Sequence, residues 1–125
     1  MVITNKELDD YLVSIDGLIH GYKGNKILSS GFFEVSQGWN QLIKELITDL
    51  INLGWNKEVT QVKEKFGTLR FYIGEGTGDI HKRIVKAEIE SLTICEISGK
   101  VGKLRTDIGW YRTLCDEEYD KIKNK

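Results

Sequence analysis

The sequence contains no proline, only two cysteines and two histidines, and no long apolar run. Without proline, every turn must be made by Gly, Asn, Asp or Ser, and the 13 glycines fit that requirement. No apolar stretch approaches the roughly 18 residues that span a bilayer, so we expect no membrane partner. The first residues lack a basic segment followed by an apolar one, which predicts no secretory signal and a cytoplasmic location.

An excess of positive charge is also missing. The 18 Lys and Arg residues face 19 Asp and Glu residues, which gives a net charge of −1. Nucleic-acid-binding chains usually carry a basic excess that replaces phosphate counterions, so only a local basic patch would suit that role here. The 125 residues, 40% hydrophobic and 30% charged, fit a single folded domain over residues 1–125.

Most catalytic motifs are absent as well. His20 and His81 lie in different segments without the His-Glu-x-x-His spacing of zinc hydrolases. The glycine-rich stretch 74–78 lacks the lysine of a phosphate loop and carries acidic neighbours. A nucleophilic pair of Cys95 or Cys115 with a histidine stays open, because such partners meet only in the fold. We therefore expect a protein that binds rather than an enzyme.

Apolar periodicity places the secondary structure. The spacing of apolar residues predicts helices, and alternation on both sides of Phe66-Gly67 predicts a β-hairpin in which Val59, Gln61 and Lys63 share one face. Thr4 and Glu7 form a capping box before the first helix. The helices are expected over residues 5–16, 39–53 and 79–92, with short strands over 93–113 and a last helix from residue 115. These elements predict an α+β fold.

Two motifs are long enough to be specific. Gly38-Trp39 opens a helix, and residues 61–72 run Gln-Val-Lys-Glu-Lys-Phe-Gly-Thr-Leu-Arg-Phe-Tyr. Further on, Cys-Glu-Ile-Ser-Gly at 95–99 precedes Trp-Tyr-Arg-Thr-Leu-Cys-Asp-Glu-Glu at 110–118. On these motifs, residues 31–119 resemble a family of small, mostly uncharacterised bacterial, phage and prophage proteins with a QVKEKFGxLRFY hairpin and a CxxCG…W…TLCxxH zinc ribbon. The resemblance implies helices packed on a small antiparallel hairpin, with a zinc-ribbon-like subdomain over 93–125.

The chain departs from that family at the metal. Ser98 stands in place of the second cysteine and Glu118 in place of the final histidine, while the spacing Cys95-x₂-Ser98, 16 residues, Cys115-x₂-Glu118 follows the zinc signature. Structural zinc needs four good donors, typically thiolates and imidazoles. We therefore expect no cofactor, with zinc held by two thiolates and a carboxylate, or a disulfide, as the alternatives. Packing against the 79–92 helix is expected to replace the metal, through Leu104, Trp110, Leu114 and Tyr119.

Two charged sets are the candidate binding surfaces. The acidic set complements the dipole of the last helix or offers a negative patch to a basic partner, and consists of Asp116, Glu117, Glu118 and Asp120. The basic set, interleaved with aromatics, consists of Lys63, Lys65, Arg70, Lys103 and Arg105. The first predicts a non-enzymatic protein-binding module, for instance an immunity or inhibitor protein that neutralises a toxin or another enzyme. The second predicts a nucleic-acid-binding protein of phage or prophage type.

Overall fold

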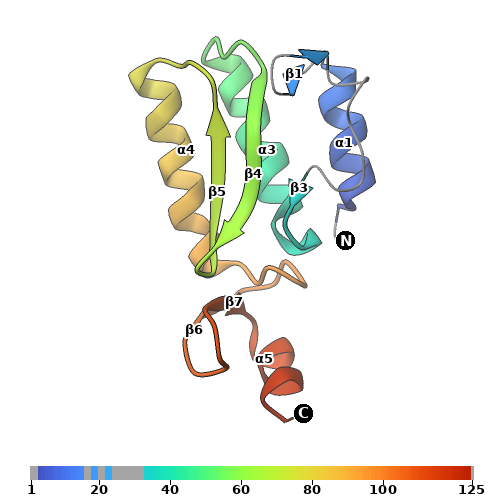
Figure 1. Ribbon diagram of the computed structural model, residues 1–125, viewed down its shortest axis with the longest axis vertical. Helices are drawn as coiled ribbons and strands as arrows, with labels where there is room; N and C mark the ends of the chain where they lie inside the picture. Colours follow the sequence, from blue (N-terminus) through green and yellow to red (C-terminus); the bar gives the residue numbers. More distant parts are fainter. Residues whose placement is uncertain (1–2, 16–17, 20–21, 24–32, 125) are drawn as a thin grey trace.

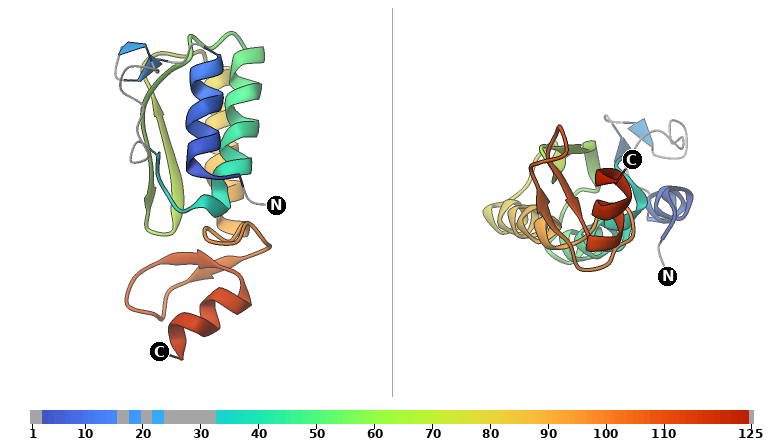
Figure 2. Two further views of the ribbon diagram at one scale, coloured as in Figure 1. Left: turned by 90° about the vertical axis from the view of Figure 1, so that its right-hand side faces the viewer. Right: turned by 90° about the horizontal axis from the view of Figure 1, so that it is seen from below.

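The chain forms two layers, a sheet and the helices on one of its faces, with a smaller C-terminal part beyond them (Figures 1 and 2). The structure is a computed structural model that describes residues 3–15, 18–19, 22–23 and 33–124, with the backbone alone for 18–19, 22–23 and 33–34. His20 lies outside the described residues. The helices are α1 (Asn5–Ser14), the 3₁₀ turn η1 (Gln37–Trp39), α3 (Asn40–Asn52), α4 (Gly78–Glu90), the 3₁₀ turn η2 (Ser91–Thr93) and α5 (Asp116–Lys123).

The strands complete the expected α+β fold. They are β1 (Leu18–Ile19), β2 (Tyr22–Lys23), β3 (Phe33–Glu34), β4 (Glu58–Lys65), β5 (Thr68–Ile73), β6 (Lys103–Arg105) and β7 (Arg112–Leu114). Strand β4 is the centre of the larger sheet: it pairs antiparallel with β5 on one side and parallel with β1 and β3 on the other. Strands β6 and β7 form a separate antiparallel pair. The predicted hairpin is therefore present, inside a mixed sheet. None of the described helices is long and apolar enough to cross a bilayer.

The outer edge of β5 is closed by side chains. Its backbone N–H groups at Leu69 and Phe71 donate to Ser91 Oγ at 2.9 Å and to Glu88 Oε2 at 3.1 Å. An unpaired strand edge exposes donors that invite pairing with another chain. Here side chains of the α4–η2 segment accept these hydrogen bonds, so the N–H groups of Leu69 and Phe71 are not available for pairing with another strand.

A β-bulge changes which residues of β4 face the helices. The register shifts between Val59 and Gln61, so Val59 and Val62 are both buried although they are three positions apart. The expectation that Val59, Gln61 and Lys63 share one face is therefore wrong at Val59. After the bulge, Gln61 and Lys63 lie on the face opposite the helices, while Val62 packs into the core.

The main core lies between the sheet and the helices. The apolar stripe of α3 is buried through Leu42, Ile43, Leu46, Ile47 and Leu50. The other elements contribute Leu8, Leu12, Trp39, Trp55, Val59, Val62, Leu69, Phe71, Ile80, Ile84 and Ala87. Burial on this scale stabilises by about 1.5–3 kcal/mol for each large side chain, before conformational entropy is subtracted.

A second, smaller core holds the C-terminal part together. Cys95, Leu114 and Cys115 form its buried centre, with Ile97, Ile108, Tyr119 and Ile122 packed around them. The expectation that Trp110 and Leu104 pack against α4 is wrong, because their side chains are 56% and 38% exposed. Their exposure leaves both free to contact something other than this chain.

Hydrogen bonds to backbone carbonyl groups join the parts. The Gly38 N–H donates to Glu96 O at 2.8 Å, and Trp39 Nε1 donates to Ile94 O at 2.8 Å. At the hairpin tip, the Thr113 hydroxyl donates to Gly67 O at 2.7 Å. The Gly-Trp and Phe-Gly motifs therefore lie where the C-terminal part meets the sheet and helices.

Candidate binding surface

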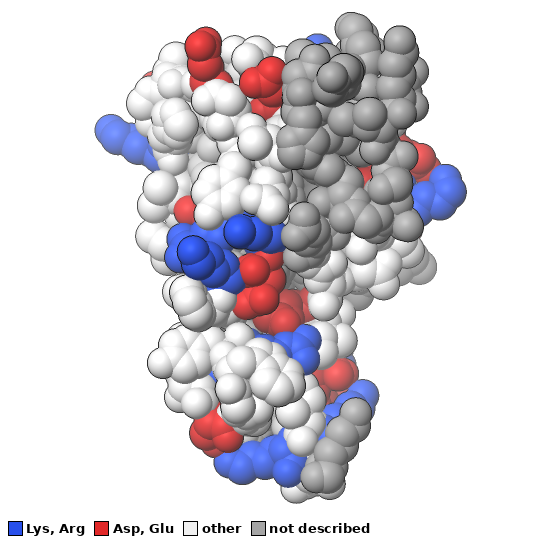
Figure 3. Space-filling model, viewed as in Figure 1, with Lys and Arg blue, Asp and Glu red and all other residues white. Residues whose placement is uncertain are grey.

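The β4–β5 hairpin presents cations and an aromatic ring on the face away from the helices. Directly opposed residues of an antiparallel pair point to the same side, and the pairs here include Lys63 with Arg70 and Gln61 with Tyr72. Figure 2 shows the helices on only one side of this hairpin, and Figure 3 shows Lys and Arg atoms gathered over the middle of the opposite side. We call Lys63, Lys65, Arg70 and Tyr72 the hairpin face.

The two lysines of this face lie beside aromatic rings. Lys63 Nζ is 5.9 Å from the centroid of the Tyr72 ring, and Lys65 Nζ is 5.8 Å from that of Phe66. Cation–π contacts at exposed sites contribute about 0.5–1 kcal/mol, which orients an ammonium group without neutralising its charge. Neither lysine forms an ion pair within the described residues, whereas Arg70 lies 3.9 Å from Glu88. Among the described side chains, both ammonium groups therefore have no carboxylate partner; the side chain of Glu34, which pairs in register with Lys63, is not among them.

Exposed apolar side chains continue from the hairpin tip onto the C-terminal part. Phe66, Trp110 and Tyr111 are 65%, 56% and 48% exposed, and the Phe66 and Tyr111 rings meet edge to face at 6.4 Å. Leu104 packs onto Gly67 of the same tip. We call Phe66, Leu104, Trp110 and Tyr111 the aromatic cluster. Figure 3 shows uncharged surface over this lower part of the molecule.

The backbone at Phe66 is unusual for its side chain. Phe66 has φ 55° and Gly67 φ 80°, and the two-residue hairpin turn that they form requires positive φ at both positions. Glycine, asparagine and aspartate tolerate that geometry, whereas a bulky L-residue costs about 1 kcal/mol there. The ring of this strained residue is exposed and is not part of the chain's own core.

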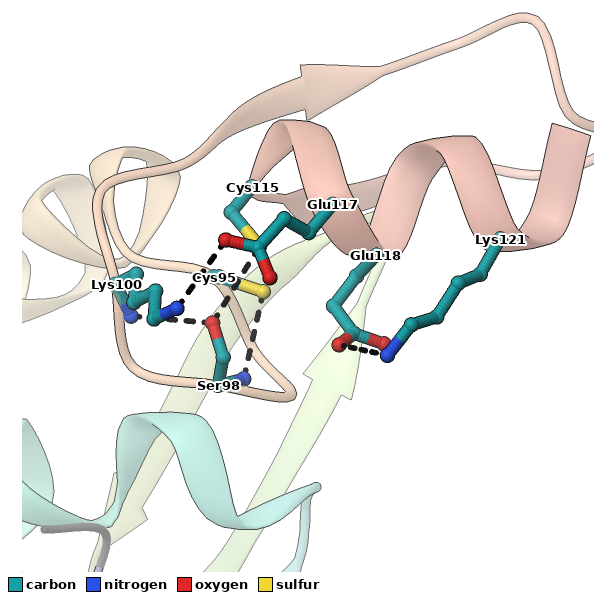
Figure 4. A network of polar contacts seen from close by, with 7 residues as sticks. All are labelled: Cys95, Ser98, Lys100, Cys115, Glu117, Glu118 and Lys121. Atoms are coloured by element: carbon teal, nitrogen blue, oxygen red, sulfur yellow. Dashed lines mark hydrogen bonds and ion pairs between the residues drawn. The ribbon is translucent and has the colours of Figure 1, made fainter.

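The acidic set is largely neutralised within the molecule. Asp116 contacts Arg105 at 2.8 Å. Glu117 contacts Lys100 at 3.2 Å and Glu118 contacts Lys121 at 3.1 Å (Figure 4). The hydrogen bond from Arg105, and then its charge, hold the pKa of Asp116 below its usual range. Asp120 is exposed. The surface therefore carries less negative charge than the sequence alone suggests.

The basic set is divided by the structure. Lys63, Lys65 and Arg70 lie together on the hairpin face, but Arg105 is buried against α5, where it donates to Leu114 O and Asp116. Its guanidinium lies 4.2 Å from the centroid of the Tyr119 ring. Lys103, two residues before Arg105 on β6, shares that side of the strand. These two residues are not part of the hairpin face.

Three of the four positions that follow the spacing of the zinc signature do meet. The Ser98 N–H donates to Cys95 Sγ at 3.4 Å, and Ser98 Oγ lies 3.5 Å from Cys115 Sγ (Figure 4). Burial would raise the pKa of Cys95, but hydrogen bonds from Ser98, Cys115 and Ile97 outweigh it and lower that pKa. Both thiols are free, and Glu118 pairs with Lys121 instead. Within the described residues, no group of three or more His, Cys, Asp or Glu could hold a metal.

Two further features were not foreseen from the sequence. Buried Glu96 accepts from Arg112 at 2.7 Å and from the Thr113 N–H at 3.3 Å, an ion pair that no local spacing reveals. A hollow of about 650 Å³ lies between α3 and the 94–100 loop. Its polar lining is already engaged in part, since Gln41 donates to Glu45 at 2.8 Å.

Comparison of the chain with protein-family models, curated proteins and solved structures gave no match.

Proposed function

We propose that the chain is a non-enzymatic module that binds another protein, and that the aromatic cluster is the centre of its interface. The observation that carries the proposal is Phe66, held at positive φ on the hairpin tip with its ring 65% exposed. Strained residues persist where the surrounding structure imposes them, and they concentrate at functional sites.

The composition of the cluster favours a protein partner. Tyr and Trp side chains dominate binding energy at protein interfaces, because they bury large areas and lose little rotamer freedom. Trp110 and Tyr111 are neighbours in the loop before β7, and Tyr111 contacts Phe66 from the other part of the chain. The rings are thus held on two elements that are fixed to each other by the Thr113–Gly67 hydrogen bond. Side chains that are already held in place lose less conformational entropy when they bind a partner.

An immunity or inhibitor role is the specific form of this proposal. The resemblance to phage and prophage proteins supports it, since such proteins include small domains that neutralise a toxin or another enzyme by covering its surface. The proposal also places the chain in the cytoplasm, an environment in which free thiols such as Cys95 and Cys115 persist.

The test is a pull-down from lysate of the native host with two matched variants. Phe66→Asn combined with Tyr111→Ser removes two rings of the cluster, and asparagine suits the positive φ at position 66 better than phenylalanine does. Val85→Ser combined with Ile89→Ser removes equally exposed apolar side chains from α4 as the control. We expect one stoichiometric protein, absent only with the first variant. A protein recovered equally with all three, or no specific protein, would refute the proposal.

Binding of nucleic acid is the second candidate, and the shared orientation of Lys63, Lys65, Arg70 and Tyr72 favours it. Retention on single-stranded DNA that falls steeply with salt, and falls further in the Lys63→Ala, Lys65→Ala variant, would support this function instead.

A further inference from the structure

We infer that the partner presents an apolar pocket bordered by carboxylates, so that Lys63 and Lys65 contact acidic groups while the aromatic cluster fills the pocket. The inference rests on the proposed function and adds the chemistry of the partner. It reverses the polarity expected from the sequence, in which the acidic set would face a basic partner.

The lysines lie next to the rings that would be buried. Lys65 immediately precedes Phe66 and has its ammonium group 5.8 Å from that ring, so an acid that pairs with Lys65 lies at the edge of the aromatic cluster. Lys63 is two positions earlier on the same side of β4 and faces Tyr72 and Arg70. Cations around an apolar centre correspond to the polar rim of a protein interface.

The acids nearest to this surface already have partners within the chain, although Figure 3 shows Asp and Glu atoms exposed directly below the Lys and Arg atoms. Glu64 Oε2 accepts from the Gly67 N–H at 2.6 Å, and Glu96 is paired with Arg112 at 2.7 Å. Among the described side chains, two lysines without an ion pair therefore stand against the one carboxylate of Glu64 beside the cluster. On α5, by contrast, Asp116 and Glu117 each have a cation within 3.2 Å. Within the part of the chain that the structure describes, the charge beside the aromatic cluster that lacks an ion-pair partner is therefore positive.

The same facts favour an acidic protein over a nucleic acid. A phosphate backbone is bound by a run of cations that replaces several counterions. Arg105 and Arg112, which lie outside the hairpin face, are paired with Asp116 and Glu96, so they do not extend its few cations into a longer run. Exposed Leu104 adds apolar area that a stacked base would not need. Carboxylates around an apolar pocket complement both properties at once.

The probe is a fluorescent peptide in which Asp and Glu alternate with Leu and Phe, tested by anisotropy against a peptide with Lys at the acidic positions and against single-stranded oligothymidine. Wild-type protein is expected to bind the acidic peptide, with an affinity that falls with salt. Lys63→Glu with Lys65→Glu should weaken binding about tenfold. The control, Lys82→Glu with Lys86→Glu, makes the same charge change on exposed positions of α4 and should bind like wild type.

Each other outcome contradicts the inference. No binding of the acidic peptide, equal loss in both charge variants, tighter binding of the Lys peptide, or tighter binding of the oligonucleotide would each overturn it. The natural partner from the pull-down separates the two proposals. If Phe66→Asn, Tyr111→Ser abolishes its binding but Lys63→Glu, Lys65→Glu does not, the inference fails and the proposed function stands. If neither variant affects its binding, both fail.

Discussion

Replacing Gly38 with alanine should disrupt the joint between the two parts of the molecule. A Cβ at position 38 would lie 2.2 Å from Cys95 O and 2.5 Å from Glu96 C, both backbone atoms that no side-chain rotation can move aside. An ordinary contact between carbon and a carbonyl oxygen is about 3.3 Å or more. The 95–96 peptide would therefore have to move by about 1 Å.

The cost follows from what that displacement breaks. Overpacking of a buried contact typically costs about 1–3 kcal/mol. The hydrogen bond from the Gly38 N–H to Glu96 O would be lost and the one from Trp39 Nε1 to Ile94 O weakened, each with a net worth of about 1 kcal/mol. Together they predict that Gly38→Ala lowers the free energy of unfolding by about 2–4 kcal/mol, a large share of a typical domain's stability.

Urea unfolding followed by tryptophan fluorescence measures this change. The control is Gly78→Ala: nothing lies within 4 Å of a Cβ there, and Gly78 is the first residue of α4, where alanine is favoured. That variant should gain about 0.5 kcal/mol. A Gly38→Ala protein within about 0.5 kcal/mol of wild type would show that the contact between η1 and the 94–100 loop is not as tight as described.

Three further predictions concern single sites. Burial raises the pKa of Asp9 to about 6 from 3.8, so ionisation of this carboxyl lowers the free energy of unfolding as the pH rises from about 4 to about 6. Urea unfolding should therefore show that Asp9→Asn gains about 1–2 kcal/mol at neutral pH and nothing near pH 4. Glu96→Ala should cost about 3 kcal/mol because it leaves Arg112 partly buried without its partner, and a double-mutant cycle with Arg112→Leu should recover part of that loss. Ser98→Cys with Glu118→Cys should create a four-thiolate site, detected as stoichiometric zinc and a melting temperature that a chelator lowers. If the double variant binds no zinc, the proposed relation to zinc ribbons is contradicted.

Local chemistry made the main elements predictable. The Thr4–Glu7 capping box is present before α1, and the apolar stripe of residues 39–53 is the buried face of α3. The turn at Phe66-Gly67 lies where alternation on both sides placed it. These features depend on residues within a few positions of one another, so the sequence contains the information needed for them.

The charged surfaces were less predictable because their partners are distant in the chain. Arg105 was grouped with the basic set, yet Asp116 neutralises it from 11 positions away. Glu117 was grouped with the acidic set, yet it pairs with Lys100 from 17 positions away. A charge run in a sequence therefore overstates the field of the folded surface wherever the fold supplies counter-charges.

The aromatic cluster shows why the interface needed the structure. In the sequence, Phe66 and Trp110 are candidates for stacking beside the basic set, but Trp110 is equally a candidate for packing against the 79–92 helix, and nothing indicates that Tyr111 lies beside Phe66. The exposure of these rings depends on how the hairpin tip packs against the C-terminal part of the chain. Gly67 is the tip residue whose backbone contacts Thr113 and Leu104. Because glycine takes the contact with the C-terminal part, the phenylalanine before it is turned outward at positive φ beside Tyr111. A residue with a smaller or more polar side chain would satisfy that turn at lower cost, so the geometry of the turn alone does not account for phenylalanine at this position.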